Sequence, residues 1–211
     1  MRLHFKYLLY LVLVVLFSSA RADDTVDYFR SINIDDAGSV TKLLARGFDP
    51  NTVNDHGQVG LYLAFRDGSP KVVAALLAHP RTRIDAVNAA DETPLMMAAL
   101  RGQVDGAQRL LDRGAALNRP GWTPLHYAAC SPEPRLVALL LERGAQVEAL
   151  SPNRTTPLMM AARYGPEEAV DLLLARGASL LARNDKGLNA ADFAQLDGRE
   201  SLSRRLGGAG R

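Results

Sequence analysis

The chain has 211 residues, of which 47% are hydrophobic, enough for one ordinary domain with a sizeable core. Its formal net charge is +2, but residues 1–22 hold three basic residues and no acidic one, which leaves 22 basic and 23 acidic residues in the remainder. This balance excludes the strongly basic surface that nucleic acids or anionic membranes attract. The single cysteine, Cys130, excludes a disulfide within the chain.

Residues 1–22 have the pattern of a secretory signal peptide. Two basic residues precede an 11-residue apolar run, Tyr7 to Phe17, and Ala20 and Ala22 then form the small-x-small pattern that signal peptidase recognises. The alternative, a membrane anchor, is disfavoured because a spanning helix needs about 20 apolar residues. We expect cleavage after Ala22. The excess of Arg over Lys, 21 to 4, is typical of a high-GC bacterium and predicts a periplasmic location.

One phrase of sequence recurs three times in the remaining residues. It begins with Thr-Pro-Leu at Thr93, Thr123 and Thr156, and the first Leu of a later Leu pair follows each Thr by 17 residues. The same interval fits three weaker copies, which begin at Val26, Val59 and Asn189. Successive copies start 30 to 34 residues apart, while the interval from Thr to Leu stays at 17 residues. The segments that connect one copy to the next therefore contain the differences in length. Each unit therefore has a packed part of fixed length and an exposed connection.

Within each copy, the residues predict two helices joined by a turn. Thr is a good N-cap, and the Pro after it occupies the first helical turn, where a missing N–H costs nothing. A Gly such as Gly102 marks the turn into a second helix with apolar residues at helical spacing, and a Gly such as Gly114 marks its end. The prediction is a repeated helix–turn–helix unit with an extended connection.

This pattern resembles the ankyrin repeat, whose G-x-TPLHxAA…LLxxGA motif is matched most fully from Gly121 to Ala145. The resemblance covers residues 24–206 and implies an all-α ankyrin-repeat solenoid of about six helix-pair units, two of them terminal caps. It also implies that the connections form β-hairpin fingers. The expected organisation is a signal peptide over residues 1–22, a repeat domain over residues 23–206 and a flexible tail over residues 207–211.

Two units and one finger depart from the pattern. The second unit has Val59 and Gly60 in place of Thr-Pro, which removes the hydroxyl cap and predicts a looser helix start, at a cost of about 1 kcal/mol. The fourth unit lacks the Gly between its helices; Pro132 can start its second helix, and we expect a turn of distinct shape. The finger between Asn118 and Thr123 is shorter than the others, so we expect it to be stubby.

No GxSxG, HExxH or phosphate-loop motif is present, so we expect no enzyme, no cofactor and no metal. The resemblance assigns His126, at the His of TPLH, to hydrogen bonds between neighbouring units. Cys130 is expected to be a small packing residue, with oxidation or pairing between chains as the alternative. The pairs Met96-Met97 and Met159-Met160 allow thioether binding of Cu(I), but flexible Met filling the core between helices is the favoured interpretation.

If the repeated positions hold the scaffold, the positions that vary between units are free for recognition. In an ankyrin array these are the finger tips and the two residues after the Ala pair, which project toward the concave side. Trp, Tyr and Arg dominate binding hot spots, so Trp122, Arg101, Arg163 and Tyr164 are the predicted anchors. The alternative is that Trp122 packs on its own short finger. The predicted partner-binding residues are Arg66, Asp67, Glu92, Leu100, Arg101, Trp122, Ser131, Thr155, Arg163 and Tyr164.

The predicted function is protein binding without catalysis, as a periplasmic adaptor or protective partner of an envelope or stress enzyme. An inhibitor or immunity protein that blocks a toxic enzyme is the first alternative, and an enzyme of an unfamiliar kind is the second. The fold cannot choose among them. We expect a monomer that binds a protein partner, no nucleic acid and, in its mature form, no membrane.

Overall fold

The computed structural model describes residues 23–209, and the predicted signal peptide lies outside them. The chain divides between Arg83 and Ile84 into two compact units, and each is described by itself. No helix within residues 23–209 is long and apolar enough to span a bilayer. The single repeat domain expected over residues 23–206 stays a prediction.

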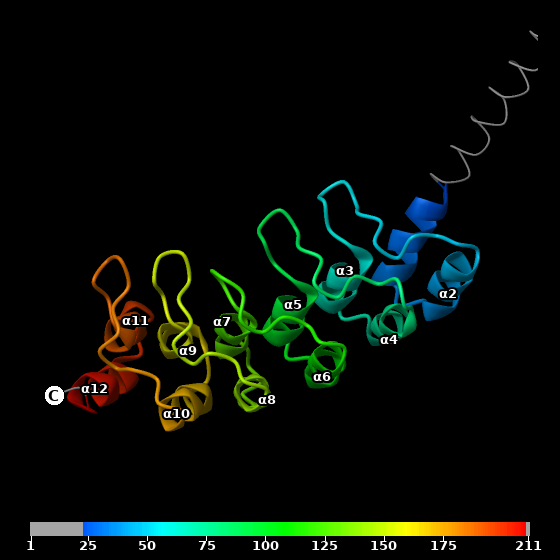
Figure 1. Ribbon diagram of the computed structural model, residues 1–211. Helices are drawn as coiled ribbons and strands as arrows, with labels where there is room; N and C mark the ends of the chain where they lie inside the picture. Colours follow the sequence, from blue (N-terminus) through cyan, green and yellow to red (C-terminus); the bar gives the residue numbers. More distant parts are fainter. Residues whose placement is uncertain (1–22, 210–211) are drawn as a thin grey trace, which may run out of the picture. The chain divides into compact units, whose positions relative to one another are not determined.

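The described part of the first unit is built from two helix pairs (Figure 1). They are a helix over residues 23–33 with α2 (Ala37–Ala45), and α3 (Gly60–Asp67) with α4 (Pro70–Ala78). The core contains Tyr28, Ile32, Leu61 and Phe65, each at most 1% exposed. Val26 lies inside the first helix and is 56% exposed. Val26, which matches the interval of the repeated phrase, is therefore not an N-cap, because the helix already includes residues 23–25.

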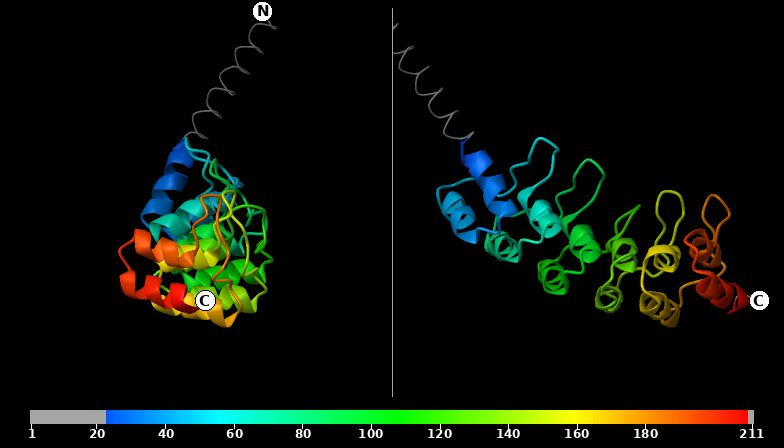
Figure 2. Two further views of the ribbon diagram at one scale, coloured as in Figure 1. Left: turned by 90° about the vertical axis from the view of Figure 1, so that its left-hand side faces the viewer. Right: turned by 180° about the vertical axis from the view of Figure 1, so that it is seen from behind.

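The second unit repeats the same arrangement in two rows of helices (Figures 1 and 2). One row holds α5 (Pro94–Leu100), α7 (Pro124–Ala129), α9 (Pro157–Tyr164) and α11 (Ala190–Leu196). The other holds α6 (Val104–Asp112), α8 (Arg135–Glu142), α10 (Glu167–Ala175) and α12 (Glu200–Ala209). Leu110, Leu140 and Leu173, one from each central pair, are fully buried. The predicted all-α repeat of helix pairs is confirmed.

The chain ends in a longer helix than the sequence predicts. Residues 207–209 were expected to belong to a flexible tail, but α12 continues to Ala209. Leu202 and Leu206 of this helix are 2% and 3% exposed, so its packed face extends close to the end. Residues 210–211 lie outside the described part of the chain.

The predicted helix caps form as expected in the repeated phrase. The hydroxyl groups of Thr93 and Thr156 accept hydrogen bonds from the backbone N–H groups of Met96 and Met159, each at 3.3 Å. Val59 is the N-cap of α3 and makes no side-chain cap bond, as its sequence predicts. The first turns of α5 and α9 are therefore capped by local sequence, whereas the Thr123 hydroxyl before α7 contacts His126 Nδ1 at 2.9 Å.

The second helix of the fourth repeat starts after Pro132, the earliest start that the sequence allows. Helix α8 begins at Arg135, so Pro132 is not its first residue. The carboxylate of Glu133 accepts a hydrogen bond from the backbone N–H of Arg135 at 3.1 Å and also binds its guanidinium group at 2.9 and 2.7 Å. Glu133, two residues before the helix start, thus satisfies a backbone donor of the first turn.

The fingers are tight turns that are closed by backbone hydrogen bonds and by Asn side chains. Among the described residues, the one isolated β-bridge pairs Val53 with Val59. The amide oxygens of Asn54, Asn88 and Asn184 each accept two backbone N–H groups of their own finger, at 2.9–3.0 Å. The backbone N–H groups of the same three Asn residues donate across their fingers to the carbonyl oxygens of Gln58, Glu92 and Leu188, at 3.0–3.1 Å. The fingers therefore turn back on themselves as expected, but with almost no regular strand. The finger before α7 is the shorter one expected (Figure 1).

Candidate functional site

Several of the predicted partner-binding residues lie at the C-terminal ends of the first helices in the second unit. Leu100 ends α5, and Arg101 is its C-cap. Arg163 and Tyr164 are the last two residues of α9. Helix α7 packs against both α5 and α9, in the same row. The structure therefore places these four side chains along one edge of the unit, on both sides of α7.

Arg101 and Arg163, the two arginines at this edge, form no ion pair with a described carboxylate. The guanidinium carbon of Arg163 lies 4.8 Å from the ring centre of Tyr164, which is 51% exposed, at a cation–π distance. Arg101 is exposed. Neither arginine forms an ion pair with any residue that the structure describes, whereas most other arginines do. This edge thus carries two uncompensated positive charges and an exposed aromatic ring.

Trp122 packs on its own repeat and keeps part of its surface exposed. Its ring centre lies 5.2 Å from that of His126, with the ring planes at 77°, the edge-to-face geometry that aromatic rings prefer. The indole is half-buried. The contact supports the interpretation that Trp122 packs locally, and the exposed remainder stays available for a partner.

His126 joins its own helix to the next finger, as the resemblance implies. The side chain is fully buried. The backbone N–H of Thr123 donates to Nδ1 at 3.1 Å, so Nδ1 is unprotonated and Nε2 donates to the carbonyl oxygen of Thr155 at 3.0 Å. Burial lowers the pKa of His126 to about 4. The histidine is thus a neutral structural link between two repeats.

Two of the predicted partner-binding residues are buried and offer no surface to a partner. Ser131 is 0% exposed, and its hydroxyl accepts a hydrogen bond from the backbone N–H of Glu133 at 3.2 Å. Thr155 is 2% exposed, and its N–H donates to the hydroxyl of Ser151 at 2.9 Å. Both residues belong to the scaffold, so their assignment to the binding surface is corrected.

Glu92 is also held by its own unit. Its two carboxylate oxygens accept hydrogen bonds from Asn88 Nδ2 at 2.8 Å and from the Tyr127 hydroxyl at 2.9 Å. Tyr127 is half-buried on α7 and was not predicted as a surface residue. The sequence did offer an indication, because Tyr127 takes a position of the repeated phrase that Met occupies in the units before and after it. The finger before α5 and helix α7 are therefore joined by this pair.

The sulfur atoms serve packing and local hydrogen bonds. The Cys130 thiol donates to the carbonyl oxygen of His126 at 3.4 Å, and burial raises its pKa to about 12, so the nucleophilic thiolate is suppressed. The thioethers of Met96 and Met159 accept the N–H groups of their N-cap residues at 3.4 Å. Within residues 23–209, no three His, Cys, Asp or Glu side chains are grouped as metal ligands.

In the first unit, the predicted residues Arg66 and Asp67 form an ion pair with each other. Arg66 Nε and Nη2 bind the two carboxylate oxygens of Asp67 at 2.6 and 2.9 Å, and Nη1 donates to Gln58 at 3.2 Å. The hydrogen bond with Asp67 raises the pKa of Arg66. The charge of Arg66 is therefore largely compensated within its own unit.

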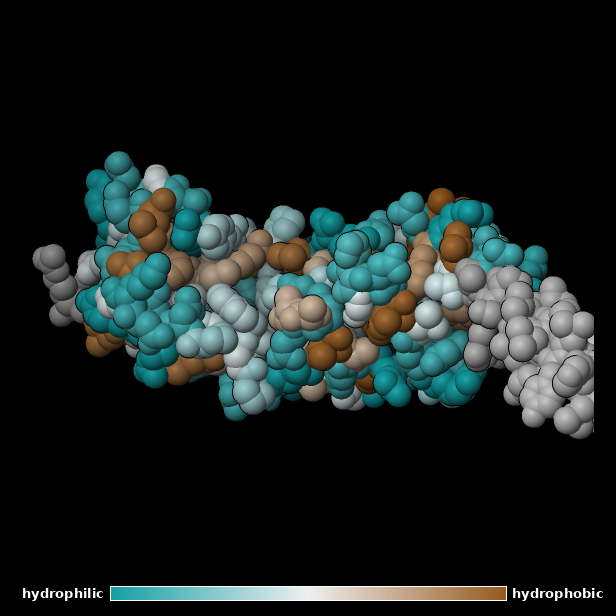
Figure 3. Space-filling model, turned by 90° about the horizontal axis from the view of Figure 1, so that it is seen from above, coloured by the Kyte–Doolittle hydropathy of each residue, from teal (hydrophilic) through white to brown (hydrophobic). Residues whose placement is uncertain are grey.

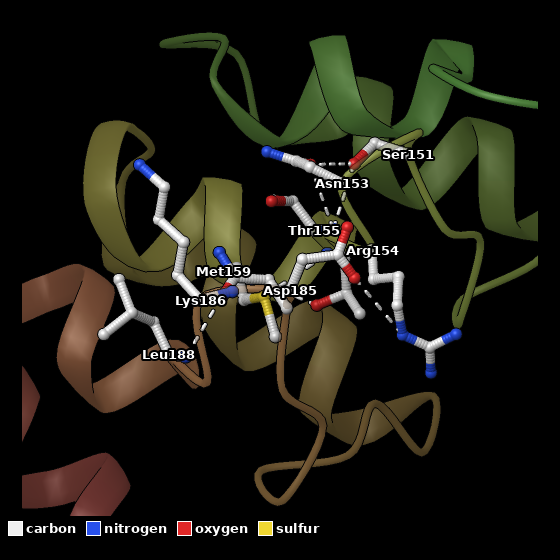
Figure 4. A network of polar contacts seen from close by, with 10 residues as sticks. Ser151, Asn153, Arg154, Thr155, Met159, Asp185, Lys186 and Leu188 are labelled. Atoms are coloured by element: carbon white, nitrogen blue, oxygen red, sulfur yellow. Dashed lines mark hydrogen bonds and ion pairs between the residues drawn. The ribbon is translucent and has the colours of Figure 1, made fainter.

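A polar network that sequence reasoning missed joins the last two fingers of the second unit (Figure 4). The Ser151 hydroxyl donates to Asn153 at 2.6 Å, and the backbone N–H of Asp185 donates to the carbonyl oxygen of Asn153 at 3.1 Å. The side chains of Arg154 and Asp185 lie 4.0 Å apart as an ion pair. Neighbouring fingers thus support one another through their backbones as well as their side chains.

Comparisons with known proteins agree with this architecture. The family model for ankyrin repeats, in three copies, matches residues 31–120 and 115–184. Over 189 residues the chain is 31% identical to tyrosine-protein kinase Shark of Drosophila melanogaster, covering 87% of this chain and 20% of the kinase. Over 92 residues it is 46% identical to neurogenic locus notch homolog protein 4 of Homo sapiens, covering 41% and 4% of the two chains.

A third relative is the nuclear factor NF-kappa-B p105 subunit of Gallus gallus, 31% identical over 146 residues, which are 66% of this chain and 15% of the relative. The chain thus spans a fifth or less of the length of these relatives. The matched family model covers well over half of the chain, and the structure shows the helix pairs, capped first helices and projecting fingers in the matched residues. This chain belongs to the ankyrin-repeat family.

Proposed function

We propose that this chain is an exported binding protein that captures a protein partner and carries out no chemistry of its own. Ankyrin repeats are protein–protein interaction modules and are generally non-catalytic. The buried, uncharged state of His126 and the protonated thiol of Cys130 fit a scaffold rather than an active site. The proposed role is that of a periplasmic adaptor or protective partner of an envelope or stress enzyme.

The observation that carries the proposal is the exposure of four candidate anchors: Arg101, Arg163 and Tyr164 at the C-terminal ends of α5 and α9, and Trp122 before the N-cap of α7. The repeated positions around these residues are buried or capped, whereas these side chains remain at least partly exposed. Trp, Tyr and Arg contribute most to protein interfaces because they combine apolar area with hydrogen-bonding or charged groups. Viewed from the side of the fingers, most of the surface is hydrophilic and apolar groups form separate patches (Figure 3). Recognition by a few such anchors fits this surface.

The proposal is tested by comparing how much partner is captured by the unmodified chain and by a variant with four substitutions, called the quadruple variant. Arg101, Trp122, Arg163 and Tyr164 are replaced by Ala, and a matched control carries Ala at the exposed residues Arg109, Glu168 and Arg204 of the second helices. Tagged proteins are used to recover partners from periplasmic extract, with quantitative mass spectrometry and thermal unfolding of each variant. We expect the quadruple variant to stay folded and lose a partner that the control keeps. Equal recovery by both would contradict the proposal.

The periplasmic location is supported by the pattern of residues 1–22 and has its own test. Cell fractionation followed by N-terminal sequencing is expected to find a chain that starts at Asp23 in the periplasmic fraction. A chain that keeps its N-terminal residues in the cytoplasm would contradict export, but it would leave the binding surface untouched.

The activity of the captured partner separates the adaptor role from the alternative of an inhibitor. An adaptor or protective partner leaves the activity of its client enzyme intact or increases it. An inhibitor or immunity protein abolishes the activity of its target in a stoichiometric complex. Assay of the partner with and without this chain, and with the quadruple variant, decides between the two.

A further inference from the structure

The first unit contains an open cavity of about 420 Å³ that the proposed function does not use. Three elements line it, namely the helix over residues 23–33, the finger at residues 53–55 and helix α3. The volume falls in the range of pockets that hold small molecules or single side chains of a partner, about 300–1,000 Å³. The cavity lies wholly within this compact unit.

The cavity has apolar side chains on all three of its elements, and some of them are partly exposed. Val26, Phe29 and Asn33 lie on one face of the first helix at helical spacing and line one side. Val53 of the finger also lines the cavity. Its side chain is 50% exposed because the cavity is open. Leu63 of α3, which is 4% exposed, provides part of the floor. Filling the cavity with an apolar group would bury these exposed walls.

The rim of the cavity carries one free charge, and that charge is negative. Arg66 and Asp67 line the rim, but their bidentate ion pair compensates both charges. Asp55, at the tip of the finger, is exposed and forms no ion pair with a residue in the described part of the chain. A ligand that reaches the apolar interior therefore passes an unpaired carboxylate.

We propose that this cavity binds an extended peptide segment that inserts an apolar side chain and carries a Lys or Arg beside it. The apolar side chain fills the space between Val26, Phe29 and Val53, and the neighbouring cation lies next to Asp55. This inference goes beyond the proposed function, because it gives the first unit a site and a ligand chemistry of its own. It does not depend on the edge around Tyr164.

Three synthetic heptapeptides test the ligand chemistry. Each has blocked ends, and their central three residues are Arg-Phe-Arg, Glu-Phe-Glu and Arg-Ser-Arg. Titration into the isotope-labelled chain, followed by NMR, is expected to shift the backbone signals of Phe29 and Val53 with the first peptide. The acidic peptide should bind about two- to fivefold more weakly than the Arg-Phe-Arg peptide, because one exposed ion pair contributes about that factor to the affinity. Equal or tighter binding of the acidic or the Ser peptide would overturn the proposal.

Variants of the chain locate the site. Val53→Glu should reduce binding of the Arg-Phe-Arg peptide more than tenfold. Val87→Glu is the matched control, since Val87 is 42% exposed and precedes Asn88 of its finger as Val53 precedes Asn54. Asp55→Asn should keep binding of both Phe peptides and remove the difference between them. Unchanged binding by Val53→Glu, or a self-associated chain that Val53→Glu dissociates in sedimentation experiments, would overturn the proposal.

The same peptides separate this inference from the proposed function. The variant with Ala at Arg101, Trp122, Arg163 and Tyr164 should bind the Arg-Phe-Arg peptide as the unmodified chain does. If that variant loses both the peptide and the partner, the cavity is not an independent site and the inference fails. If the peptide never binds while partner capture depends on those four residues, the inference fails and the proposed function stands.

Discussion

The hydroxyl group of Tyr28 occupies the position that a β-carbon on Gly60 would take. The same hydroxyl donates a hydrogen bond to the carbonyl oxygen of Pro50 at 2.9 Å, and burial raises the pKa of Tyr28 so that it stays protonated. The second repeat, which lies in the first compact unit, has Gly60 where the Thr-Pro-Leu repeats have Pro. This departure from the repeat therefore has a steric reason, since the first helix places Tyr28 against the start of α3.

Replacement of Gly60 tests this relationship. Gly60→Ala should lower the free energy of unfolding by about 1–3 kcal/mol, because the added methyl group overlaps a buried side chain. Tyr28→Phe should cost about 1 kcal/mol through its lost hydrogen bond and should also make room beside Gly60. Urea unfolding of the two single variants and the double variant is the measurement. We expect the double variant to lose less than the sum of the singles, and strict additivity would contradict the steric account.

The neutral state of His126 makes stability depend on pH. Its pKa is about 4 in the folded chain and about 6.5 when unfolded, so the unfolded chain binds a proton first. Neutral His126 therefore contributes to the free energy of unfolding in full above pH 6.5. This contribution, about 3 kcal/mol, is lost as the pH falls from 6.5 to 4. His126→Met retains an acceptor like that of Met96. Unfolding free energies between pH 4 and 7 should fall less steeply for the variant, and parallel curves would contradict the prediction.

Substitutions at two equivalent finger positions distinguish the effect of backbone strain on stability from the effect of lost side-chain contacts. Gly187 and Arg154 each lie three residues after the residue that closes their finger, and both have positive φ, 74° and 61°. Gly187→Ala should destabilise the chain by about 1 kcal/mol, because a side chain disfavours this conformation. Arg154→Ala should change stability by less than half as much, since a side chain is already present there. Calorimetric melting temperatures compare the two, and equal losses would count against the account.

Arg199 caps the end of α9 from another repeat. Its Nη1 donates to the carbonyl oxygens of Ala161, Ala162 and Gly165 at 3.1, 2.9 and 2.8 Å. Arg199→Ala should cost about 1.5–3 kcal/mol, because hydrogen bonds to a charged group are stronger than neutral ones. Hydrogen exchange should accelerate in the last turn of α9. Arg204→Ala, an exposed change on α12, is the control, and similar exchange in both variants would show that the cap is unimportant.

The scaffold could be predicted from the sequence because its determinants are local and repeated. Thr93 and Thr156 accept cap hydrogen bonds from residues three positions later. The buried residues Leu110, Leu140 and Leu173 each follow the Thr of their own repeat by 17 residues. The Asn residues that close the fingers were missed although they are local too. Each lies five residues before an N-cap, and a search for that spacing would have found them.

The surface was harder to predict because exposure depends on residues that are distant in sequence. Ser131 and Thr155 occupy variable positions, yet they are buried against neighbouring turns and helices. Tyr127 stands where the neighbouring repeats have Met, but that difference does not show that its hydroxyl binds Glu92 of the preceding repeat. The repeat thus shows which positions are free to vary, whereas only the packed structure shows which of them reach the surface.

The account as a whole predicts that the partner contacts the edge at the ends of α5 and α9 in living cells. Site-specific photo-crosslinking measures this most directly, with a photoreactive residue placed singly at Arg101 or Tyr164 and, as controls, at Arg109 or Arg204. We predict one crosslinked partner of the same mass from both edge positions and none from the controls on the second helices. Crosslinks to the partner from Arg109 or Arg204, with none from Arg101 and Tyr164, would contradict the account.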